Sequence, residues 1–257
     1  MPATTPAIPP ATPATPPATP PGSDPTARRS PANRRAFLTA TAATVLTSAT
    51  AVASAAPAST RPAAGRARPG TAEQALAALL EGNRRWAKGR SRHPHEDRAR
   101  RLEVTQEQHP FATVLSCVDS RVPPELVFDQ GLGDLLVIRT AGEVLDEAVL
   151  GSLQFGVAEL HIPLLLVLGH ERCGAVAATI EQLRTGKQVP GHLARLVEGI
   201  VPSAWACRDE PGDWVDHTVA AHARRMRDTL RADPAFRPTT VLAARFDLDS
   251  GLARVLP

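Results

Sequence analysis

Three short apolar runs constrain the fold of this chain more than any other feature. Each is bounded by glycine, proline or charge, and they read FATVLSC (111–117), DLLVIRT (134–140) and PLLLVLG (163–169). Runs of this length without polar alternation are typical of strands that are buried on both faces. Because stretches with helical periodicity separate and follow them, the pattern predicts an α/β fold. We expect a central, mostly parallel β-sheet flanked by helices on both faces.

The stretches around these runs predict four helices and a closing hairpin. In the first, TAEQALAALLEGNRRW, Thr71 and Gln74 have capping-box spacing, and we expect this helix to end at Gly82 and to lie outside the main body. Leucine and valine recur at helical spacing in EVLDEAVLGSLQFGVAELH (143–161). GAVAATIEQLRTG (174–186) and HTVAAHARRMRDTLRADP (217–234) also indicate helices, and VLAARFDLDSGLARVL (241–256) indicates a pair of strands.

The first 70 residues differ in composition from the rest of the chain. They hold 14 of the 25 prolines and too few large apolar residues to form a core. Within them, NRRAFLTATAATVLTSATAVASAAPAS combines paired arginines, an Ala- and Thr-rich apolar stretch and a small-residue site near Ala55. This pattern is typical of a twin-arginine export signal. We expect a leader and signal at 1–55, a flexible linker at 56–70 and a folded domain at 71–257.

Export by the twin-arginine machinery would place the protein outside the cytoplasm. The alternatives for the apolar stretch are a membrane anchor and a chance apolar run. Serine and threonine dilute it more than is usual for an anchor, which favours cleavage and no lasting membrane span. Four arginines and one aspartate precede residue 56, and without them the 29 basic and 26 acidic residues balance. The net charge therefore gives no support to nucleic-acid binding.

Two of the three cysteines stand where a metal site would form. Cys117 ends the first apolar run, and His170 and Cys173 follow the third. Ligands gather at the carboxyl ends of strands in such sheets. Two thiolates and one imidazole suit zinc, and three protein ligands leave the open position of a catalytic site. The alternative is a pair of buried apolar thiols with an unrelated turn histidine. Cys207 belongs to no motif, and we expect a free or loop thiol there rather than an intermolecular disulfide.

The sequence around these residues resembles the β-class carbonic anhydrases. CVDSRVPPELVFDQGLGDLLVIRTAGEV followed by LGHERCGAV matches the family patterns CxDSR and GHxxCG, and the resemblance extends from about Gly82 to RFDLDSG near the end of the chain. It implies zinc-dependent, reversible hydration of carbon dioxide to bicarbonate and a proton, by a hydroxide on the metal. It also implies a homodimer or a larger homo-oligomer.

The resemblance assigns a role to six residues. It implies one zinc ion per chain on Cys117, His170 and Cys173, a catalytic pair formed by Asp119 and Arg121, and substrate binding by Gln108 from across a dimer interface. An Asp119 released from Arg121 would itself reach the zinc and block the water position. No proton carrier is identified, and His161 and His109 are candidates only by residue type.

The sequence departs from the family pattern at several positions. A bicarbonate site that regulates some members uses a tryptophan, an arginine and a tyrosine. Here Val114 replaces the tryptophan and the chain has no tyrosine, although Arg139 remains. We therefore expect this regulation to be absent. Glu143, Phe155 and Leu136 replace a common asparagine, tyrosine and phenylalanine, and we expect none of the three to touch the metal shell.

Three other functions fit parts of the pattern. The same metal shell would support hydrolysis of carbonyl sulfide or carbon disulfide, which substrate assays distinguish from hydration. A non-catalytic zinc-binding homologue would need neither Asp119, Arg121 nor Gln108. A thiol redox protein would need two cysteines that can pair, and no C-x-x-C motif occurs.

Overall fold

The computed structural model describes residues 68–257, and the predicted leader, signal and most of the linker lie outside the described residues. A five-stranded sheet in the order β2-β1-β3-β4-β5 forms the centre of the fold. Pairing is parallel throughout except between β4 and β5. The strands are β1 (Ala112–Ser116), β2 (Leu135–Arg139), β3 (Leu164–His170), β4 (Thr240–Phe246) and β5 (Ala253–Leu256). The predicted fold class is confirmed.

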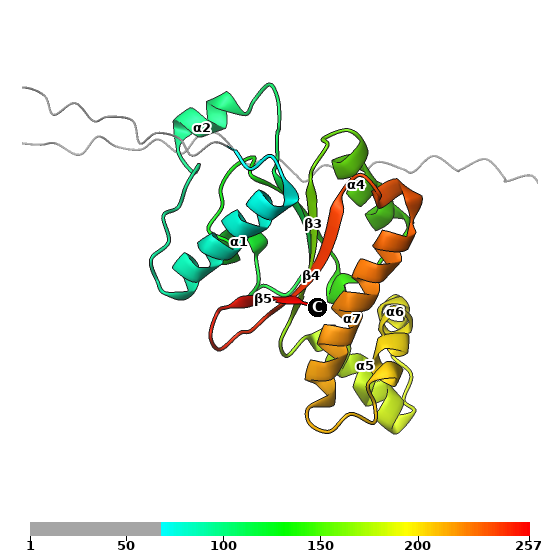
Figure 1. The fold of residues 1–257 in the computed structure, drawn as a ribbon. Helices are drawn as coiled ribbons and strands as arrows, with labels where there is room; N and C mark the ends of the chain where they lie inside the picture. Colours follow the sequence, from blue (N-terminus) through cyan, green and yellow to red (C-terminus); the bar gives the residue numbers. More distant parts are fainter. Residues whose placement is uncertain (1–67) are drawn as a thin grey trace, which may run out of the picture. The chain divides into compact units, whose positions relative to one another are not determined.

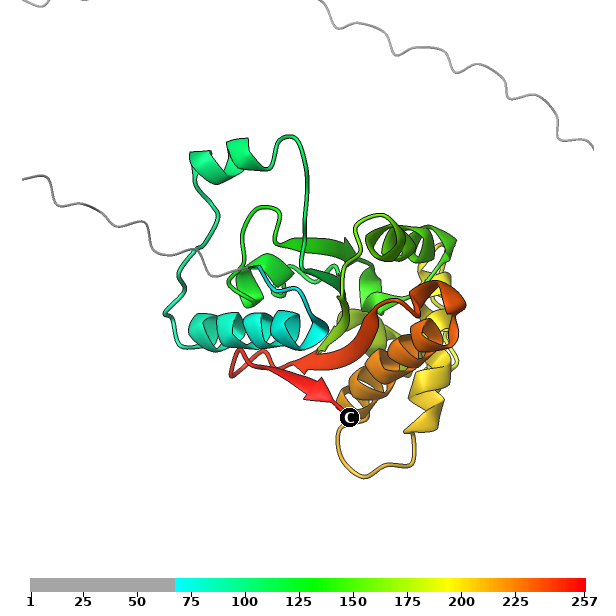
Figure 2. The same cartoon turned by 45° about the horizontal axis from the view of Figure 1, so that its top comes forward.

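Helices cover both faces of this sheet (Figures 1 and 2). They are α1 (Ala72–Ala87), α2 (Arg98–Glu103), α3 (Pro124–Val127), α4 (Glu147–Ala158), α5 (Gly174–Thr185), α6 (Leu193–Ala206) and α7 (Trp214–Ala232), with short 3-10 turns η1 (Ala141–Glu143) and η2 (Pro234–Phe236). Among residues 68–257, none of the helices has both the length and the apolar character that a membrane crossing requires.

The core forms because successive strand residues face opposite sides of the sheet. On β3, Leu164, Leu166 and Leu168 pack with α1 and α3, whereas Leu165 and Val167 pack with α4 and α7. All residues of β1 and β3 are buried, as their mainly apolar sequences predict. The edge strand β2 is only half-buried along its length, so the prediction of burial on both faces is wrong for that strand.

The first helix departs from its prediction in length and position. Thr71 caps it as expected, because its hydroxyl accepts from the amide of Gln74 at 3.3 Å. The helix continues through Gly82 to Ala87, and Ala75 and Leu79 are fully buried against the sheet. A Cβ on Gly82 would lie 1.8 Å from the carbonyl oxygen of Phe128. Close packing, not helix termination, therefore explains this glycine.

Candidate metal centre

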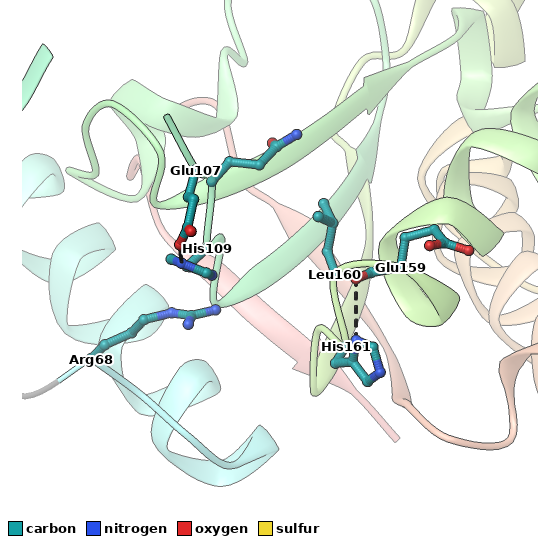
Figure 3. A pocket seen from close by; sticks show the side chains of 7 residues that line it. Arg68, Glu107, His109, Glu159, Leu160 and His161 are labelled. Carbon is teal, nitrogen blue, oxygen red and sulfur yellow. Dashed lines mark hydrogen bonds and ion pairs between the residues drawn. The ribbon is translucent and has the colours of Figure 1, made fainter. Parts of the chain in front are cut away.

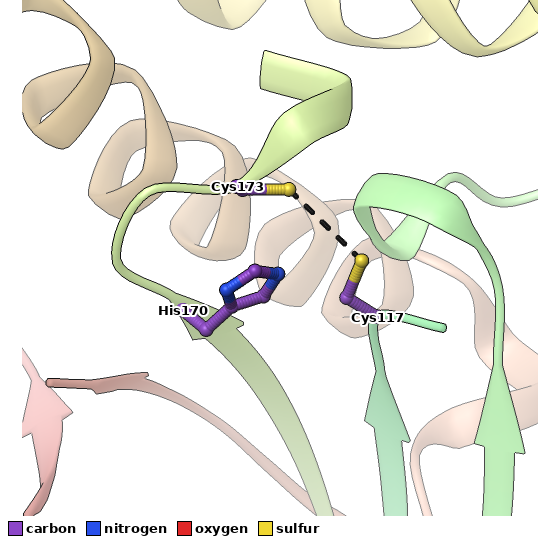
Figure 4. A group of neighbouring side chains, drawn as sticks. All are labelled: Cys117, His170 and Cys173. Atoms are coloured by element: carbon purple, nitrogen blue, oxygen red, sulfur yellow. Dashed lines mark hydrogen bonds between the residues drawn. The ribbon is translucent and has the colours of Figure 1, made fainter. Parts of the chain in front are cut away.

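The three predicted metal ligands meet at the carboxyl ends of two neighbouring strands. β1 and β3 are adjacent in the sheet; Cys117 directly follows β1, and His170 is the last residue of β3. Cys173 is the N-cap residue of α5, so the short turn between β3 and α5 separates it from His170. All three side chains are buried, and their ligand atoms lie within 4.8 Å of one another (Figure 4). Among the described residues, this is the group whose geometry suits a metal ion.

The spacing of the three donors fits tetrahedral zinc. The sulfurs of Cys117 and Cys173 are 4.0 Å apart and are not bonded to each other. Two zinc–sulfur bonds of about 2.3 Å at a tetrahedral angle would place the sulfurs roughly 3.8 Å apart. Nδ1 of His170 lies 2.9 Å from the carbonyl oxygen of Glu171, which fixes Nδ1 as the protonated nitrogen. Nε2 is buried and has no hydrogen-bond partner, as expected for a nitrogen that binds a metal ion.

The two thiols strongly influence each other's ionisation. Their hydrogen bond lowers the pKa of Cys117 and raises that of Cys173. The amide of Gly142 also donates to the Cys117 sulfur, at 3.3 Å, and stabilises negative charge there. Because the sulfurs are in contact, distance alone does not disfavour the thiol redox alternative. The unpartnered imidazole nitrogen beside them is what favours a metal.

Asp119 and Arg121 form a tight pair beside the three ligands. The Arg121 guanidinium donates to both carboxylate oxygens, at 2.9 and 2.7 Å, and the Arg121 amide donates to Oδ1 at 3.0 Å. These bonds hold the pKa of Asp119 well below its usual range. Oδ2 of Asp119 is 4.0 Å from Nε2 of His170, so the carboxylate lies next to the site while Arg121 restrains it.

Arg139 fixes the backbone on which this site is built. It is the last residue of β2, beside Ser116 at the end of β1. Its Nε donates to the carbonyl of Cys117 at 2.8 Å, and its Nη2 donates to the carbonyl of Asp119 at 2.7 Å. Arg139 therefore restrains the positions of one metal ligand and of the neighbouring carboxylate, a contact that spacing in the sequence did not reveal.

Glu143 is a second contact that the sequence did not reveal. Its side chain is buried and lies near Cys117, and Oε1 has no hydrogen-bond partner. Burial, reinforced by the Cys117 sulfur, raises the pKa of Glu143 well above the usual range. The backbone amide of Cys117 also contacts the carboxyl group. The expectation that no departure touches the metal shell is therefore wrong for Glu143.

Gln108 does not join the other predicted site residues. It precedes β1, whereas Cys117 follows that strand, so the two lie toward opposite ends of β1. Gln108 instead lines an open cavity with His109 and His161. Cys207 is elsewhere as well: it is a free, buried thiol at the end of α6, where it contacts the Ser203 carbonyl and the Thr218 hydroxyl.

Comparisons with known proteins point to a single family. A family model described as carbonic anhydrase matches residues 112–251. A carbonic anhydrase from Mycolicibacterium smegmatis is 46% identical over 145 residues, which are 56% of this chain and 70% of the relative. Carbonic anhydrase 2 from Mycobacterium tuberculosis is 43% identical over 155 residues, 60% of this chain and 75% of the relative.

Solved structures agree in fold. One of them comes from work on two tetrameric β-carbonic anhydrases of the ascomycete Sordaria macrospora. It superposes with a TM-score of 0.56 at 19% identity, over 70% of this chain and 96% of that chain.

Proposed function

The chain belongs to the β-class carbonic anhydrase family and is a carbonic anhydrase, and from this premise we propose how it works. One zinc ion binds to Cys117, His170 and Cys173, and the enzyme converts carbon dioxide and water reversibly into bicarbonate and a proton. The main observation behind this proposal is the arrangement of the three ligand atoms. Two sulfurs 4.0 Å apart adjoin a buried imidazole nitrogen that has no hydrogen-bond partner.

Bound zinc would supply an ionised water molecule at moderate pH and would offset negative charge on the substrate oxygen. The protein side chains supply orientation. Asp119 stays ionised because Arg121 donates two hydrogen bonds to it, so its carboxylate can only accept a hydrogen bond from the attacking water. That bond directs the lone pair of the water oxygen toward carbon. Arg121 also keeps the carboxylate from turning toward the ligands.

A second copy of the chain completes the site in this proposal. If Gln108 orients the substrate through its amide, it must do so for another chain, because β1 separates it from Cys117 in its own chain. A homodimer is the smallest assembly that meets this requirement. The tetrameric state named for the Sordaria macrospora proteins is consistent with larger assemblies of such dimers.

Metal analysis combined with stopped-flow hydration tests the mechanism. Asp119→Ala removes the carboxylate beside the metal. Asp228→Ala is the matched control, because Asp228 pairs with Arg227 on α7, away from the site. We expect one zinc per chain in all three proteins, a loss of hydration of about 100-fold or more in Asp119→Ala, and wild-type rates in Asp228→Ala. Zinc-loaded wild-type protein that does not hydrate carbon dioxide at mildly alkaline pH would contradict the proposal.

Export is a separate proposal that rests on the sequence of residues 1–55. We propose that the twin-arginine machinery exports the folded protein and that the signal is then removed. Replacing Arg34 and Arg35 with lysine should retain the protein in the cytoplasm in its uncleaved form. Export of this variant at the wild-type level would refute the assignment.

A further inference from the structure

The turn between β3 and α5 separates two of the proposed metal ligands, His170 and Cys173. It lies at the carboxyl end of β3, whereas the open cavity that Gln108 lines is at the amino ends of β1 and β3 (Figure 3). Within the turn, Arg172 has a φ of 52°, in the left-handed region that is unfavourable for residues other than glycine. Such a backbone persists only where its surroundings restrain it. The turn therefore depends on contacts with other parts of the chain.

Glu171 supplies several of these contacts, and it makes them with the hairpin that β4 and β5 form. Its amide donates to the carbonyl of Phe246, the last residue of β4, at 2.9 Å. Its carboxylate Oε2 accepts from the amide of Leu248 at 3.0 Å, and Oε1 lies 3.9 Å from Nη2 of Arg245. The Glu171 side chain is only 19% exposed, so solvent and salt screen these contacts less than those of a surface residue.

The carbonyl of Glu171 is also the group that orients the His170 ring. Nδ1 of His170 donates to this carbonyl at 2.9 Å, which directs Nε2 toward the two sulfurs. A partner of this kind fixes the orientation of a metal-binding imidazole and makes it a better ligand. The carbonyl belongs to the peptide that joins Glu171 to Arg172, the residue with the unfavourable φ. The side-chain contacts of Glu171 therefore restrain the same short segment that orients the imidazole.

We propose that Glu171 is a positioning residue for the metal centre. Its carboxylate, by accepting from the Leu248 amide, holds the turn on the β4–β5 hairpin and keeps the Glu171 carbonyl on Nδ1 of His170. The inference rests on the proposed function, in which His170 is a zinc ligand. Without the carboxylate, the peptide is free to turn and the imidazole loses a restraint on its orientation. Zinc should then leave the protein more quickly, because each ligand of a tetrahedral site must stay in position.

The rate at which zinc passes from the loaded protein to a chromogenic chelator tests this role. Glu171→Ala removes the acceptor, Glu171→Asp shortens it so that it no longer reaches the Leu248 amide, and Glu171→Gln keeps an oxygen that can accept. Asp249→Ala is the matched control, because Asp249 is an acid of the same hairpin that pairs with Arg172 but is 75% exposed.

We expect Glu171→Ala and Glu171→Asp to release zinc about 10-fold faster than the wild type, the low end for a group that supports a metal ligand. Glu171→Gln should release zinc at nearly the wild-type rate, a rescue that a general loss of packing would not show. Asp249→Ala should also match the wild type, because exposed ion pairs contribute little. If Glu171→Ala does not fold, the comparison of Glu171→Asp with Glu171→Gln still decides the question.

Three results would overturn the role of Glu171. The first is a wild-type rate of zinc release from Glu171→Asp. The second is equally fast release from Glu171→Asp and Glu171→Gln, which would show that the hydrogen bond to Leu248 is not what holds the turn. The third is an equal acceleration in Asp249→Ala, which would assign the effect to the hairpin in general. A wild-type protein that binds no zinc would instead overturn the proposed function, so the two failures are distinguishable.

Discussion

Acid should destabilise this protein through one buried histidine, His222 on α7. The ring is fully buried; Nδ1 contacts the Ser203 hydroxyl at 3.0 Å, and Nε2 has no partner. Burial lowers the pKa of His222 to about 4, whereas a histidine in the unfolded chain titrates near 6.5. Between these two values, the unfolded chain binds a proton that the folded chain does not bind. The free energy of unfolding should therefore fall as the pH falls through this window and be unaffected by His222 above it.

The expected loss follows from the width of that window. At roughly 1.4 kcal/mol for each pH unit, the interval from about 6.5 to about 4 corresponds to about 3 kcal/mol. Urea unfolding of zinc-loaded wild type and His222→Gln at a series of pH values measures it. The variant starts less stable but should lose less on acidification. His217→Gln, on the same helix, should follow the wild type. Parallel curves for wild type and His222→Gln would refute the reasoning.

Three further predictions follow from the site and its supports. Gly82→Ala should lower the free energy of unfolding by about 1–3 kcal/mol, and with it the melting temperature, because the new methyl group would meet the Phe128 carbonyl. This effect is opposite in sign to the usual gain from Gly→Ala inside a helix. An unchanged or raised melting temperature would contradict the packing described. Arg139→Met should reduce hydration more than Arg139→Lys, since it removes both donors to the Cys117 and Asp119 carbonyls; equal activity of the two variants in stopped-flow assays would count against the restraint. Removal of zinc by a chelator should abolish hydration and lower the melting temperature, because a ligand that binds only the folded state stabilises it. Added zinc should restore both. Hydration that survives a chelator treatment shown to remove the metal would contradict the zinc mechanism.

The sequence predicted the sheet and the Cys–His–Cys cluster because both depend on local patterns. Mainly apolar runs specify β1 and β3, and the positions of Cys117, His170 and Cys173 follow from where those strands end. The register of the strands then brings the three together, as expected for parallel neighbours.

Other features depend on contacts between distant parts of the chain and left no local signal. Gly82 resembles a helix stop, yet its reason is the approach of Phe128. The periodic patterns assign nothing to α6, since Pro202 within it is a residue that normally ends a helix. Glu143 lies next to Cys117 because η1 packs against the residue that follows β1, where the Gly142 amide contacts the Cys117 sulfur. β2 contains at least as many apolar residues as β1, but its place at the edge of the sheet leaves it half-exposed.

X-ray absorption at the zinc edge, on protein purified with its metal, tests the central claim most directly. We predict one zinc per chain with two sulfur ligands at about 2.3 Å and the remaining ligands nitrogen or oxygen at about 2.0–2.1 Å. Replacement of Cys173 with serine should reduce the sulfur count to one. A shell of four sulfurs, a shell with none, or a Cys117–Cys173 disulfide in the active enzyme would contradict the account.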